Sequence, residues 1–527
     1  MTTVKALDTK MILEAAWIIR SAAVSSSTSR RTQLDGGRPG ETACCGWASP
    51  QPRSFFKRAL GFLNIAFLSV AATAHAANQP SPARPNLIVI MTDDQGYADV
   101  GFNGCKDIPT PNIDAIAANG VRFTSGYVVY PVCSPSRAGF ITGRYPQRFG
   151  YERNPRFQPE NRASGLALTE TTIADALAKV GYHSGLVGKW HLGAHPDLHP
   201  LKRGFNEFFG HLGGGARYFP EEMTLKRATG AMDEGDSYRL QILRNHEPVR
   251  TTNYLTDEFS DEAVRFVTRN KAQPFFLFLS YNAPHTPMQA SEKYLSRFPN
   301  IKNPNRRTYA AMVSAVDDGV GRVLATLKQL NLDTNTLVFF LSDNGGPEQA
   351  NASNNGALRG GKSDAWEGGI RVPFAVQWPG RLPKGTVYDQ PVLSLDIFAT
   401  IAALAGAPTD PARPLDGVNL MPYLTGTNTG TPHEAVYLRK FDQGAFAVRS
   451  GQFKLVVPSR DAPAQLFDLD ADISETRNLA AVNPEKLKQL EKLRADWSSQ
   501  LIEPVFEGLM TGKNALGKAK AGAPLDE

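Results

Sequence analysis

The chain has 527 residues, enough for one large domain with a small appendage or for two or three domains. Its hydrophobic content of 42% and charged content of 20% are ordinary for a soluble globular protein. The net charge is +6, but residues 1–76 carry nine Lys or Arg and four Asp or Glu, so the remainder holds 48 basic and 47 acidic residues. This balance excludes the electrostatic footprint of a nucleic-acid-binding protein, and we expect no such partner.

The first 76 residues predict an export leader. Lys57-Arg58 precede an apolar run over 59–74, and Ala74-His75-Ala76 supplies a cleavage site of small residues. This order is typical of a secretory signal peptide, which we place at 55–76, and nothing upstream suggests a function. The run is shorter than the ~20 apolar residues that span a bilayer, so we expect no stable membrane anchor. A mature chain in the periplasm or the medium follows, beginning with a Pro-rich linker at 77–85.

Three continuous apolar runs predict buried parallel strands, at 86–91, 275–279 and 337–341. Helical patterns lie between them, at 171–180, 256–269 and 307–330. We expect Thr169 to cap the first of these helices and Gly181 to stop it. Alternating strands and helices predict an α/β fold with a large, mostly parallel central sheet sandwiched by helices. We assign residues 86–430 to this domain.

The pattern changes after about residue 431. Short alternating runs at 435–438, 445–448 and 454–457 predict antiparallel strands, and a charged helical pattern follows at 485–501. We therefore expect a smaller C-terminal subdomain of antiparallel sheet plus helix over 431–511. The Gly-, Ala- and Lys-rich tail at 512–527 is predicted to be flexible.

Acidic and amide side chains directly follow two of the predicted strands: Asp93-Asp94 after the first and Asp343-Asn344 after the third. Ligands of open α/β sheets bind beyond the carboxyl ends of the strands. Carboxylate and amide oxygens suit a hard cation, Ca²⁺ or alternatively Mg²⁺. The alternative is that both pairs are ordinary turn sequences, which bond to their own backbone.

The segment from Cys133 to Arg144, Cys-Ser-Pro-Ser-Arg-Ala-Gly-Phe-Ile-Thr-Gly-Arg, is the most informative in the chain. Ser134 can cap a helix with Pro135 at its first position, which places Cys133 at the positive end of the helix dipole. A lone Cys is more often a small buried hydrophobic residue. The whole run, however, resembles the modification signature of type I sulfatases of the alkaline phosphatase superfamily. In that signature the Cys becomes formylglycine (3-oxoalanine), so the resemblance implies a formylglycine-generating maturation enzyme as a partner.

Further segments resemble the same family and occur in the order it requires. Gly181 to His191 is similar to its second signature, and Ala283-Pro-His285-Thr-Pro287, Leu358 to Lys362 and Trp366 to Arg371 are similar to later segments. The resemblance runs from about Pro85 to the C-terminal helix. Within this family, the sequence resembles arylsulfatases and bacterial carbohydrate sulfatases of the N-acetylgalactosamine-6-sulfatase type.

The resemblance implies a sulfuric ester hydrolase and a role for each matching residue. A divalent cation is implied to bind Asp93, Asp94, Asp343, Asn344 and the modified Cys133. Arg137 and Lys189 are implied to steady the formylglycine hydrate, and Lys189 with Lys362 to neutralise the sulfate oxygens. His285 is implied to protonate the leaving alcohol and His191 to accept a proton during regeneration. One hydroxyl of the hydrate attacks sulfur to give a covalent sulfate–enzyme intermediate, and the other releases the sulfate.

The substrate is less well defined. Export and the resemblance favour a sulfated glycan, while an aryl sulfate remains open. His211 and Arg217 are candidate sugar contacts, and Gly214 stands where arylsulfatase-like relatives can place a Ser. A phosphonate or phosphate ester hydrolase of the same superfamily is the nearest alternative. An inactive carbohydrate-binding relative and a metal-binding structural protein are weaker ones.

The cysteines separate into two groups. Cys44 and Cys45 lie in the leader, and only Cys105 and Cys133 remain in the predicted mature chain. Two cysteines in an exported protein could form a disulfide. If Cys133 is modified, Cys105 has no partner, so we expect no disulfide.

Overall fold

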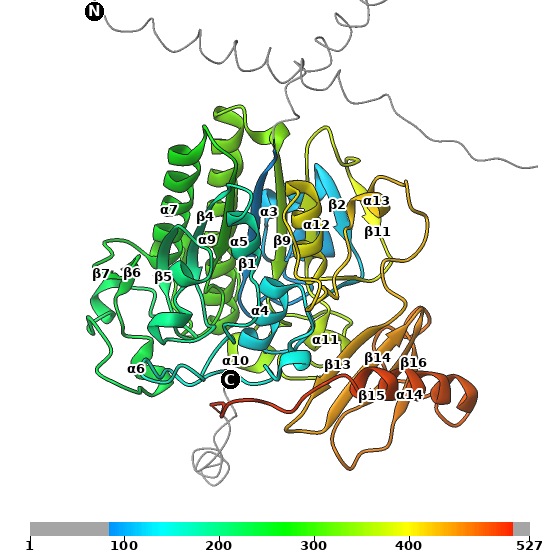
Figure 1. The fold of residues 1–527 in the computed structure, drawn as a ribbon. Helices are drawn as coiled ribbons and strands as arrows, with labels where there is room; N and C mark the ends of the chain where they lie inside the picture. Colours follow the sequence, from blue (N-terminus) through cyan, green and yellow to red (C-terminus); the bar gives the residue numbers. More distant parts are fainter. Residues whose placement is uncertain (1–83, 510–527) are drawn as a thin grey trace, which may run out of the picture. The chain divides into compact units, whose positions relative to one another are not determined.

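The computed structural model describes residues 84–509. The predicted leader at 1–76, the tail at 512–527 and all but the last two residues of the linker lie outside these residues. The described chain is built on a ten-stranded mixed sheet in the order β11-β2-β10-β9-β1-β8-β4-β5-β6-β7 (Figure 1). Its strands are β1 Asn86–Thr92, β2 Gly120–Phe123, β4 His183–Lys189, β5 Glu207–His211, β6 Ile242–Arg244, β7 Glu247–Val249, β8 Phe275–Ser280, β9 Thr336–Ser342, β10 Phe374–Gln377 and β11 Thr386–Tyr388.

The middle of this sheet is parallel, as the three apolar runs predict. β1 lies between β8 and β9, with Leu87 opposite Phe276 and Leu337, and β4 continues the parallel order beyond β8. All residues of β1, β8 and β9 are buried, so these strands are apolar on both faces. Antiparallel pairs of β10 with β2 and β9, and of β6 with β5 and β7, make the sheet mixed. The carboxyl ends of β1, β4, β8 and β9 consequently meet at one edge.

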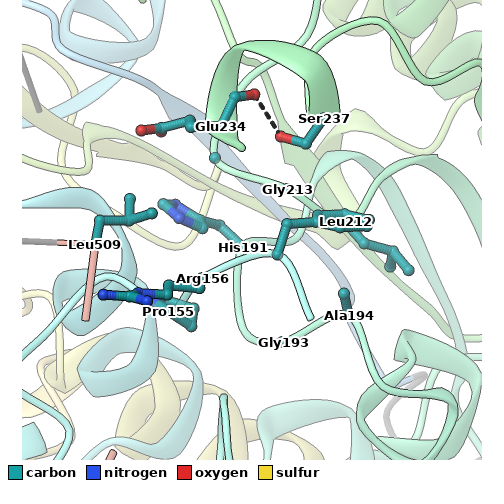
Figure 2. A pocket seen from close by; sticks show the side chains of 12 residues that line it. Pro155, Arg156, His191, Gly193, Ala194, Leu212, Gly213, Glu234, Ser237 and Leu509 are labelled. Carbon is teal, nitrogen blue, oxygen red and sulfur yellow. Dashed lines mark hydrogen bonds between the residues drawn. The ribbon is translucent and has the colours of Figure 1, made fainter. Parts of the chain in front are cut away.

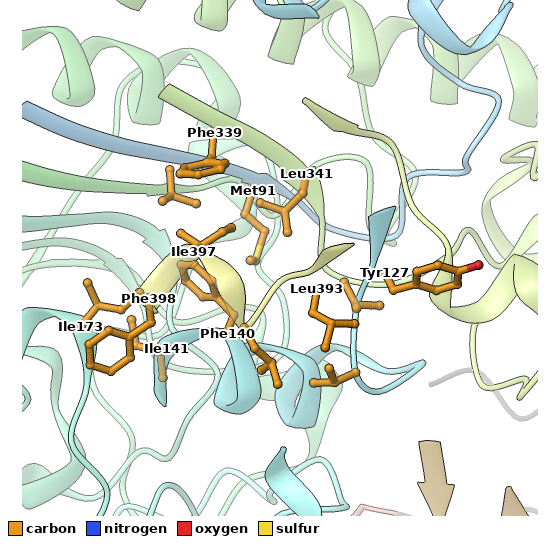
Figure 3. Close-up of a cluster of buried hydrophobic side chains, with 14 of the residues drawn as sticks. Met91, Tyr127, Phe140, Ile141, Ile173, Phe339, Leu341, Leu393, Ile397 and Phe398 are labelled. Atoms are coloured by element: carbon orange, nitrogen blue, oxygen red, sulfur yellow. The ribbon is translucent and has the colours of Figure 1, made fainter. Parts of the chain in front are cut away.

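Helices cover both faces of the sheet. On one face Leu87, Val89 and Met91 of β1 pack in a cluster with α4, Cys133–Thr142, α5, Ile173–Ala178, and α12, Asp396–Ala405 (Figure 3). On the other face Ile88 and Ile90 join α3, Pro111–Ala118, α7, Leu255–Asn270, and α9, Pro304–Gln329. Alternate residues of one strand therefore serve two cores, which confirms the predicted sandwich.

The predicted helices are present with shifted ends. α7 and α9 lie within one to three residues of the predicted starts and ends. The prediction that Thr169 caps a helix at 171–180 is wrong, because α5 begins at Ile173 and Thr172 is its cap. The Thr172 hydroxyl accepts from the Asp175 N–H, and the Asp175 carboxylate accepts from the Thr172 N–H. This reciprocal capping box fixes the start more strongly than a threonine further upstream can.

A separate four-stranded antiparallel sheet follows, in the order β13-β14-β15-β16 (Figure 1). Its elements are β13 Val436–Lys440, β14 Ala445–Ser450, β15 Phe453–Val457, β16 Gln465–Asp468 and the helix α14 Pro484–Ser498, which packs on β14 and β15. The antiparallel sheet and helix are as predicted. The fourth strand, β16, was not predicted, because Gln465-Leu-Phe-Asp468 has only two apolar residues, which are adjacent, between two polar ones. The division at residues 430 and 431 remains a prediction.

The remaining elements are short. They are β3 Gly126–Tyr127, β12 Val392–Leu393, α6 Glu234–Ser237, α8 Glu292–Leu295, α10 Glu348–Asn351, α11 Glu367–Ile370 and α13 Met421–Leu424. Within residues 84–509, no helix combines the length and the apolar character needed to cross a bilayer.

Candidate active site

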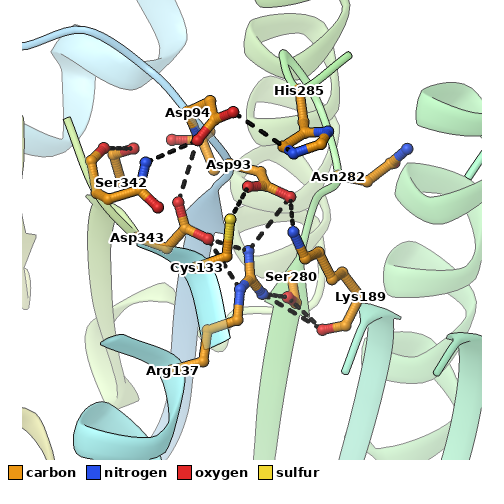
Figure 4. Close-up of polar contacts among 12 residues, drawn as sticks. Asp93, Asp94, Cys133, Arg137, Lys189, Ser280, Asn282, His285, Ser342 and Asp343 are labelled. Carbon is orange, nitrogen blue, oxygen red and sulfur yellow. Dashed lines mark hydrogen bonds and ion pairs between the residues drawn. The ribbon is translucent and has the colours of Figure 1, made fainter. Parts of the chain in front are cut away.

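Polar side chains from five elements converge where the parallel strands end. Asp93, Asp94, Cys133 and His285 each direct one potential ligand atom into a space in which these atoms lie within 4.8 Å of one another. All four residues are buried. Figure 4 shows Asp93 and Asp94 following β1, Asp343 following β9 and Lys189 at the end of β4 around this space.

The two acidic segments are brought together by strand pairing. Thr92 and Ser342 are partners at the ends of β1 and β9, so Asp94 and Asp343 follow side by side. The Asp94 N–H donates to Asp343 Oδ1 at 3.2 Å, and Asn344 Nδ2 donates to Asp94 Oδ1 at 2.7 Å. Asn344 Oδ1 is buried, and no residue in the described part of the chain donates to it. Three buried carboxylates and this free amide oxygen fit a hard divalent cation.

Cys133 lies in the first turn of α4. Its Sγ is 3.4 Å from Asp93 Oδ1, and burial, followed by the charge of Asp93, raises the pKa of the thiol well above its ordinary value. The predicted cap is wrong by two residues: Val132 is the N-cap, and Ser134 lies inside the helix. The Ser134 hydroxyl instead donates to the His191 carbonyl at 2.6 Å. Ser134 therefore joins α4 to His191, two residues beyond Lys189 at the end of β4.

Each carboxylate of the cluster has a cationic partner. Lys189 Nζ lies 2.5 Å from Asp93, Lys362 Nζ lies 3.0 Å from Asp94, and Arg137 NH2 lies 2.7 Å from Asp343. Although burial alone would raise the pKa of Asp93, Lys189, His285 and Arg137 hold it below its ordinary value. For the amine of Lys362 burial acts in the opposite direction and alone would lower the pKa. The charge of Asp94 instead holds the pKa of Lys362 well above its ordinary value. These six groups are charge-balanced, three against three.

The two predicted histidines occupy different sides of the cluster. His285 Nδ1 lies 2.6 Å from the Thr286 carbonyl, which can only accept, so Nδ1 carries a proton and Nε2 faces the site. That Nε2 is 3.5 Å from Asp94 Oδ2 and 3.4 Å from Lys362 Nζ. His191 has a φ of 56° and a buried Nδ1 with no partner within residues 84–509. Burial, then the charges of Lys189 and Arg137, hold its pKa well below the ordinary value, so its ring is neutral near pH 7.

A small cavity of about 10 Å³, enough for one water molecule, lies beside His191 (Figure 2). Gly214 lines it, and a Cβ there would lie 2.8 Å from Glu234 Oε1 and 3.1 Å from His191 Nε2. A serine at this position would need these side chains to move. Glu234 also accepts from the Tyr238 hydroxyl at 2.7 Å, and the Tyr238 ring lies 6.3 Å from that of His285.

Sequence reasoning did not find Glu234, Tyr238 or Ser280. Ser280 ends β8, accepts from Arg137 NH1 at 2.5 Å and donates to the Lys189 carbonyl at 2.7 Å. Ser280 directly follows the strand predicted at 275–279, and this position could have identified it as a residue of the site. Glu234 begins the four-residue helix α6 and Tyr238 directly follows it, and a helix this short leaves no recognisable pattern in the sequence.

The two candidate sugar contacts lie outside the carboxylate cluster. His211 ends β5 and is buried, and neither ring nitrogen has a hydrogen-bond partner in the described chain. Arg217 is 38% exposed in its side chain and lies 3.7 Å from Glu222. Cys105 and Cys133 are not bonded to each other, while Cys44 and Cys45 lie outside the described residues.

Comparison with known proteins identifies relatives over most of this length. The sulfatase family model matches residues 85–407, and the model of the N-sulphoglucosamine sulphohydrolase C-terminal region matches 362–502. The N-acetylgalactosamine-6-sulfatase of Canis lupus familiaris is 35% identical over 413 residues, 75% of each chain. The steryl-sulfatase of Homo sapiens is 33% identical over 72% of this chain and 75% of its own.

A solved structure agrees with these sequence matches. Ps i-CgsB in complex with k-i-k-neocarrahexaose superposes with a TM-score of 0.76 at 39% identity, over 84% of this chain and 98% of the other. The ordered signatures, the converged buried cluster and these matches lead to one conclusion. The chain belongs to the sulfatase family and is a sulfuric ester hydrolase of the type I class within the alkaline phosphatase superfamily.

Proposed function

We propose that this sulfatase hydrolyses sulfate monoesters of carbohydrates with a formylglycine made from Cys133. The observation that carries the proposal is the position of Cys133, which opens α4 within the Cys-Ser-Pro-Ser-Arg signature and directs Sγ toward Asp93 in a buried carboxylate cluster. A hydrated aldehyde at this position supplies two hydroxyls on one carbon, one to attack sulfur and one to allow release of sulfate. A protonated, buried thiol offers neither.

Asp93, Asp94, Asp343 and Asn344, with the modified side chain of residue 133, would hold the cation, Ca²⁺ or alternatively Mg²⁺. Their oxygens, and the unpartnered Asn344 Oδ1, match the ligand preference of both ions. When bound, the cation offsets the negative charge of the sulfate ester and of its transition state.

The chain's own residues divide the remaining work. Arg137, fixed by Asp343 and Ser280, orients the start of α4 and, with Lys189, the side chain of residue 133. Lys189 and Lys362 direct ammonium groups toward the cluster and neutralise sulfate oxygens. His285, whose Nδ1–H is held by the Thr286 carbonyl, would deliver a proton from Nε2 to the leaving alcohol, a step that requires the ring to carry a proton on both nitrogens. The neutral ring of His191 accepts a proton during regeneration.

Sulfated carbohydrates are the proposed substrate class, and two relatives support it. One is Ps i-CgsB, whose structure holds k-i-k-neocarrahexaose, and the other is N-acetylgalactosamine-6-sulfatase. We expect the enzyme to release sulfate faster from k-i-k-neocarrahexaose or from N-acetylgalactosamine 6-sulfate than from a simple aryl sulfate or a steryl sulfate. An aryl phosphonate should be a poor substrate.

The test is sulfate release by protein produced together with a formylglycine-generating enzyme. Peptide mass spectrometry should show conversion at residue 133, and Cys133→Ala should lose all turnover while keeping a wild-type melting temperature. Cys105→Ser is the matched control and should keep full activity, because Cys105 is outside the cluster. Sulfate release by Cys133→Ala, or unconverted Cys133 in active enzyme, would refute the mechanism. Faster turnover of phosphonate than of every sulfate ester would refute the reaction class.

We also propose export to the periplasm or the medium, supported by the charged, apolar and small-residue order of 55–76. Sequencing the amino terminus of the exported protein should find cleavage after Ala76. Retention of the leader on protein in the cytoplasm would contradict this proposal.

A further inference from the structure

A second cavity, of about 260 Å³, adjoins the small cavity beside His191. We call it the histidine cavity, because His199, His211 and His246 line it. The two cavities share five lining residues: Phe157, Ala194, Leu212, Gly213 and Ser237. These five residues place the histidine cavity beside the small cavity that His191 lines, although His191 itself does not line the histidine cavity.

Hydrogen-bonding atoms inside the histidine cavity have no partners in the described chain. His211 is 6% exposed and His199 is 4% exposed, yet both ring nitrogens of His211 and Nε2 of His199 lack a hydrogen bond within residues 84–509. Leaving a buried polar atom unpaired destabilises the folded protein. A protein that keeps several such atoms beside a cavity is arranged for a ligand that pairs with them.

The chemistry of these rings selects the ligand. Burial, followed by the charges of Lys189 and Arg137, holds the pKa of His211 well below its ordinary value, and burial lowers the pKa of His199 to about 4. Both rings are neutral near pH 7, so His211 offers one N–H donor and one acceptor. His199 Nδ1 already accepts from the Leu201 N–H, so its Nε2 offers a donor alone. A hydroxyl, which also donates and accepts, complements the His211 ring better than a sulfate group, which only accepts.

The walls of the histidine cavity are apolar. Phe157, Pro159, Pro196 and Leu240 line it, and its basic residues, Lys226 and Arg227, are exposed. The Arg227 guanidinium is paired with Glu247 at 2.6 Å. Apolar walls with a few placed polar groups suit a sugar ring, whose faces carry C–H groups and whose edge carries hydroxyls. A steroid would contact the apolar walls but would leave the ring nitrogens of His211 without hydrogen-bond partners.

We propose that the histidine cavity is a subsite for the sugar ring linked to the sulfated sugar, and that His211 sets specificity by hydrogen bonding to its hydroxyls. The inference rests on the proposed carbohydrate sulfatase function and deepens it. It separates recognition of the glycan chain from recognition of the sulfate group.

The test is His211→Phe, which keeps an aromatic ring next to Phe259 but removes both nitrogens. With k-i-k-neocarrahexaose as the probe, KM should rise about tenfold with little change in kcat. With a small aryl sulfate, both constants should stay at the wild-type values. His183→Phe is the matched control, since His183 lies at the opposite end of β4 from Lys189 and outside both cavities, and it should behave as wild type on both substrates.

Binding provides a second measurement that does not need turnover. In a Cys133→Ala background, calorimetry with the same hexasaccharide should show about tenfold weaker binding after His211→Phe. Equal affinities, no binding of the hexasaccharide, or an equal loss of activity on both substrates would overturn the subsite. Sulfate release from the aryl sulfate by the wild-type enzyme would leave the sulfatase function standing in each of these cases. If the proposed sulfatase function were wrong, the wild-type enzyme would instead release no sulfate from any ester.

Discussion

Lys454 of β15 joins the C-terminal sheet to the segment that follows Lys362. Its Nζ lies 2.9 Å from Glu367 Oε1 and 2.9 Å from Glu475 Oε1, and all three side chains are at most 1% exposed. Glu367 opens α11 and also accepts from the Tyr127 hydroxyl at 2.6 Å. Lys454→Met keeps most of the side-chain volume and removes the charge, so it isolates the ionic contribution of this contact.

The expected cost follows from what each carboxylate retains. Glu367 keeps Tyr127 and Arg371, so its charge stays compensated. Glu475 keeps only the Glu367 N–H on Oε2, at 2.7 Å, and becomes a buried charge without a cation. Removing one partner of a buried ion pair typically costs about 3–5 kcal/mol. We expect a loss near the lower value, about 3 kcal/mol, because one of the two carboxylates remains satisfied.

The assay is urea unfolding of four proteins: wild type, Lys454→Met, Glu475→Gln and the double variant. Glu475→Gln should recover part of the loss in the Lys454→Met background, since it removes the uncompensated charge. Burial already raises the pKa of Glu475, and loss of Lys454 raises it further. Protonation of Glu475 should therefore shrink the destabilisation as the pH falls from 7 to 5. A loss below 1 kcal/mol, or one that neither Glu475→Gln nor acid reduces, would refute the electrostatic reasoning.

Asp343→Ala should lose the bound cation and most activity, and cation retained by elemental analysis would contradict its role as a ligand. Thr172→Val should cost about 1 kcal/mol in urea unfolding because it removes the cap of α5, whereas Thr169→Val, which changes an exposed residue, should stay within about 0.5 kcal/mol. Glu262, buried against Arg244, Arg265 and Arg269, has its pKa lowered to about 2 despite burial. The stability that it contributes is present above its unfolded pKa of about 4.5 and is lost as the pH falls toward 2. Glu262→Gln should flatten the stability–pH curve in that window, and an unchanged slope would count against this assignment.

The central sheet was predictable because its middle strands are buried on both faces. Such strands are uniformly apolar, and the runs that form β1, β8 and β9 differ from the observed strands by at most one residue at either end. Helix starts were less predictable, since several threonines in the segment 169–172 compete for the cap position. Only the reciprocal bond with Asp175 selects Thr172, and that bond depends on the local backbone geometry.

The ends of the central strands made the acidic part of the site predictable, while the resemblance to sulfatase signatures supplied Cys133, Arg137, Lys189, His191, His285 and Lys362. Asp93 and Asp343 follow strands that pair directly, so their convergence follows from sheet topology alone. The same reasoning could not find Glu234 or the histidine cavity. Glu234 begins the short helix α6, and the residues of the histidine cavity come from β5, β6, α6 and loops, so their convergence depends on packing that the sequence pattern does not reveal.

The cations of the site have a second role that only the geometry reveals. Sequence reasoning assigned Lys189 and Lys362 to the sulfate group, yet each is an ion-pair partner of a carboxylate in the predicted metal site. The three carboxylates cancel the charges of Lys189, Lys362 and Arg137, so a bound divalent cation would bring the net charge of these groups to +2. That excess suits an anionic ester and would not exist if the lysines were absent. We therefore propose that Lys189 and Lys362, which pair with the buried carboxylates, would keep them compensated without the cation and would stabilise a bound sulfate group.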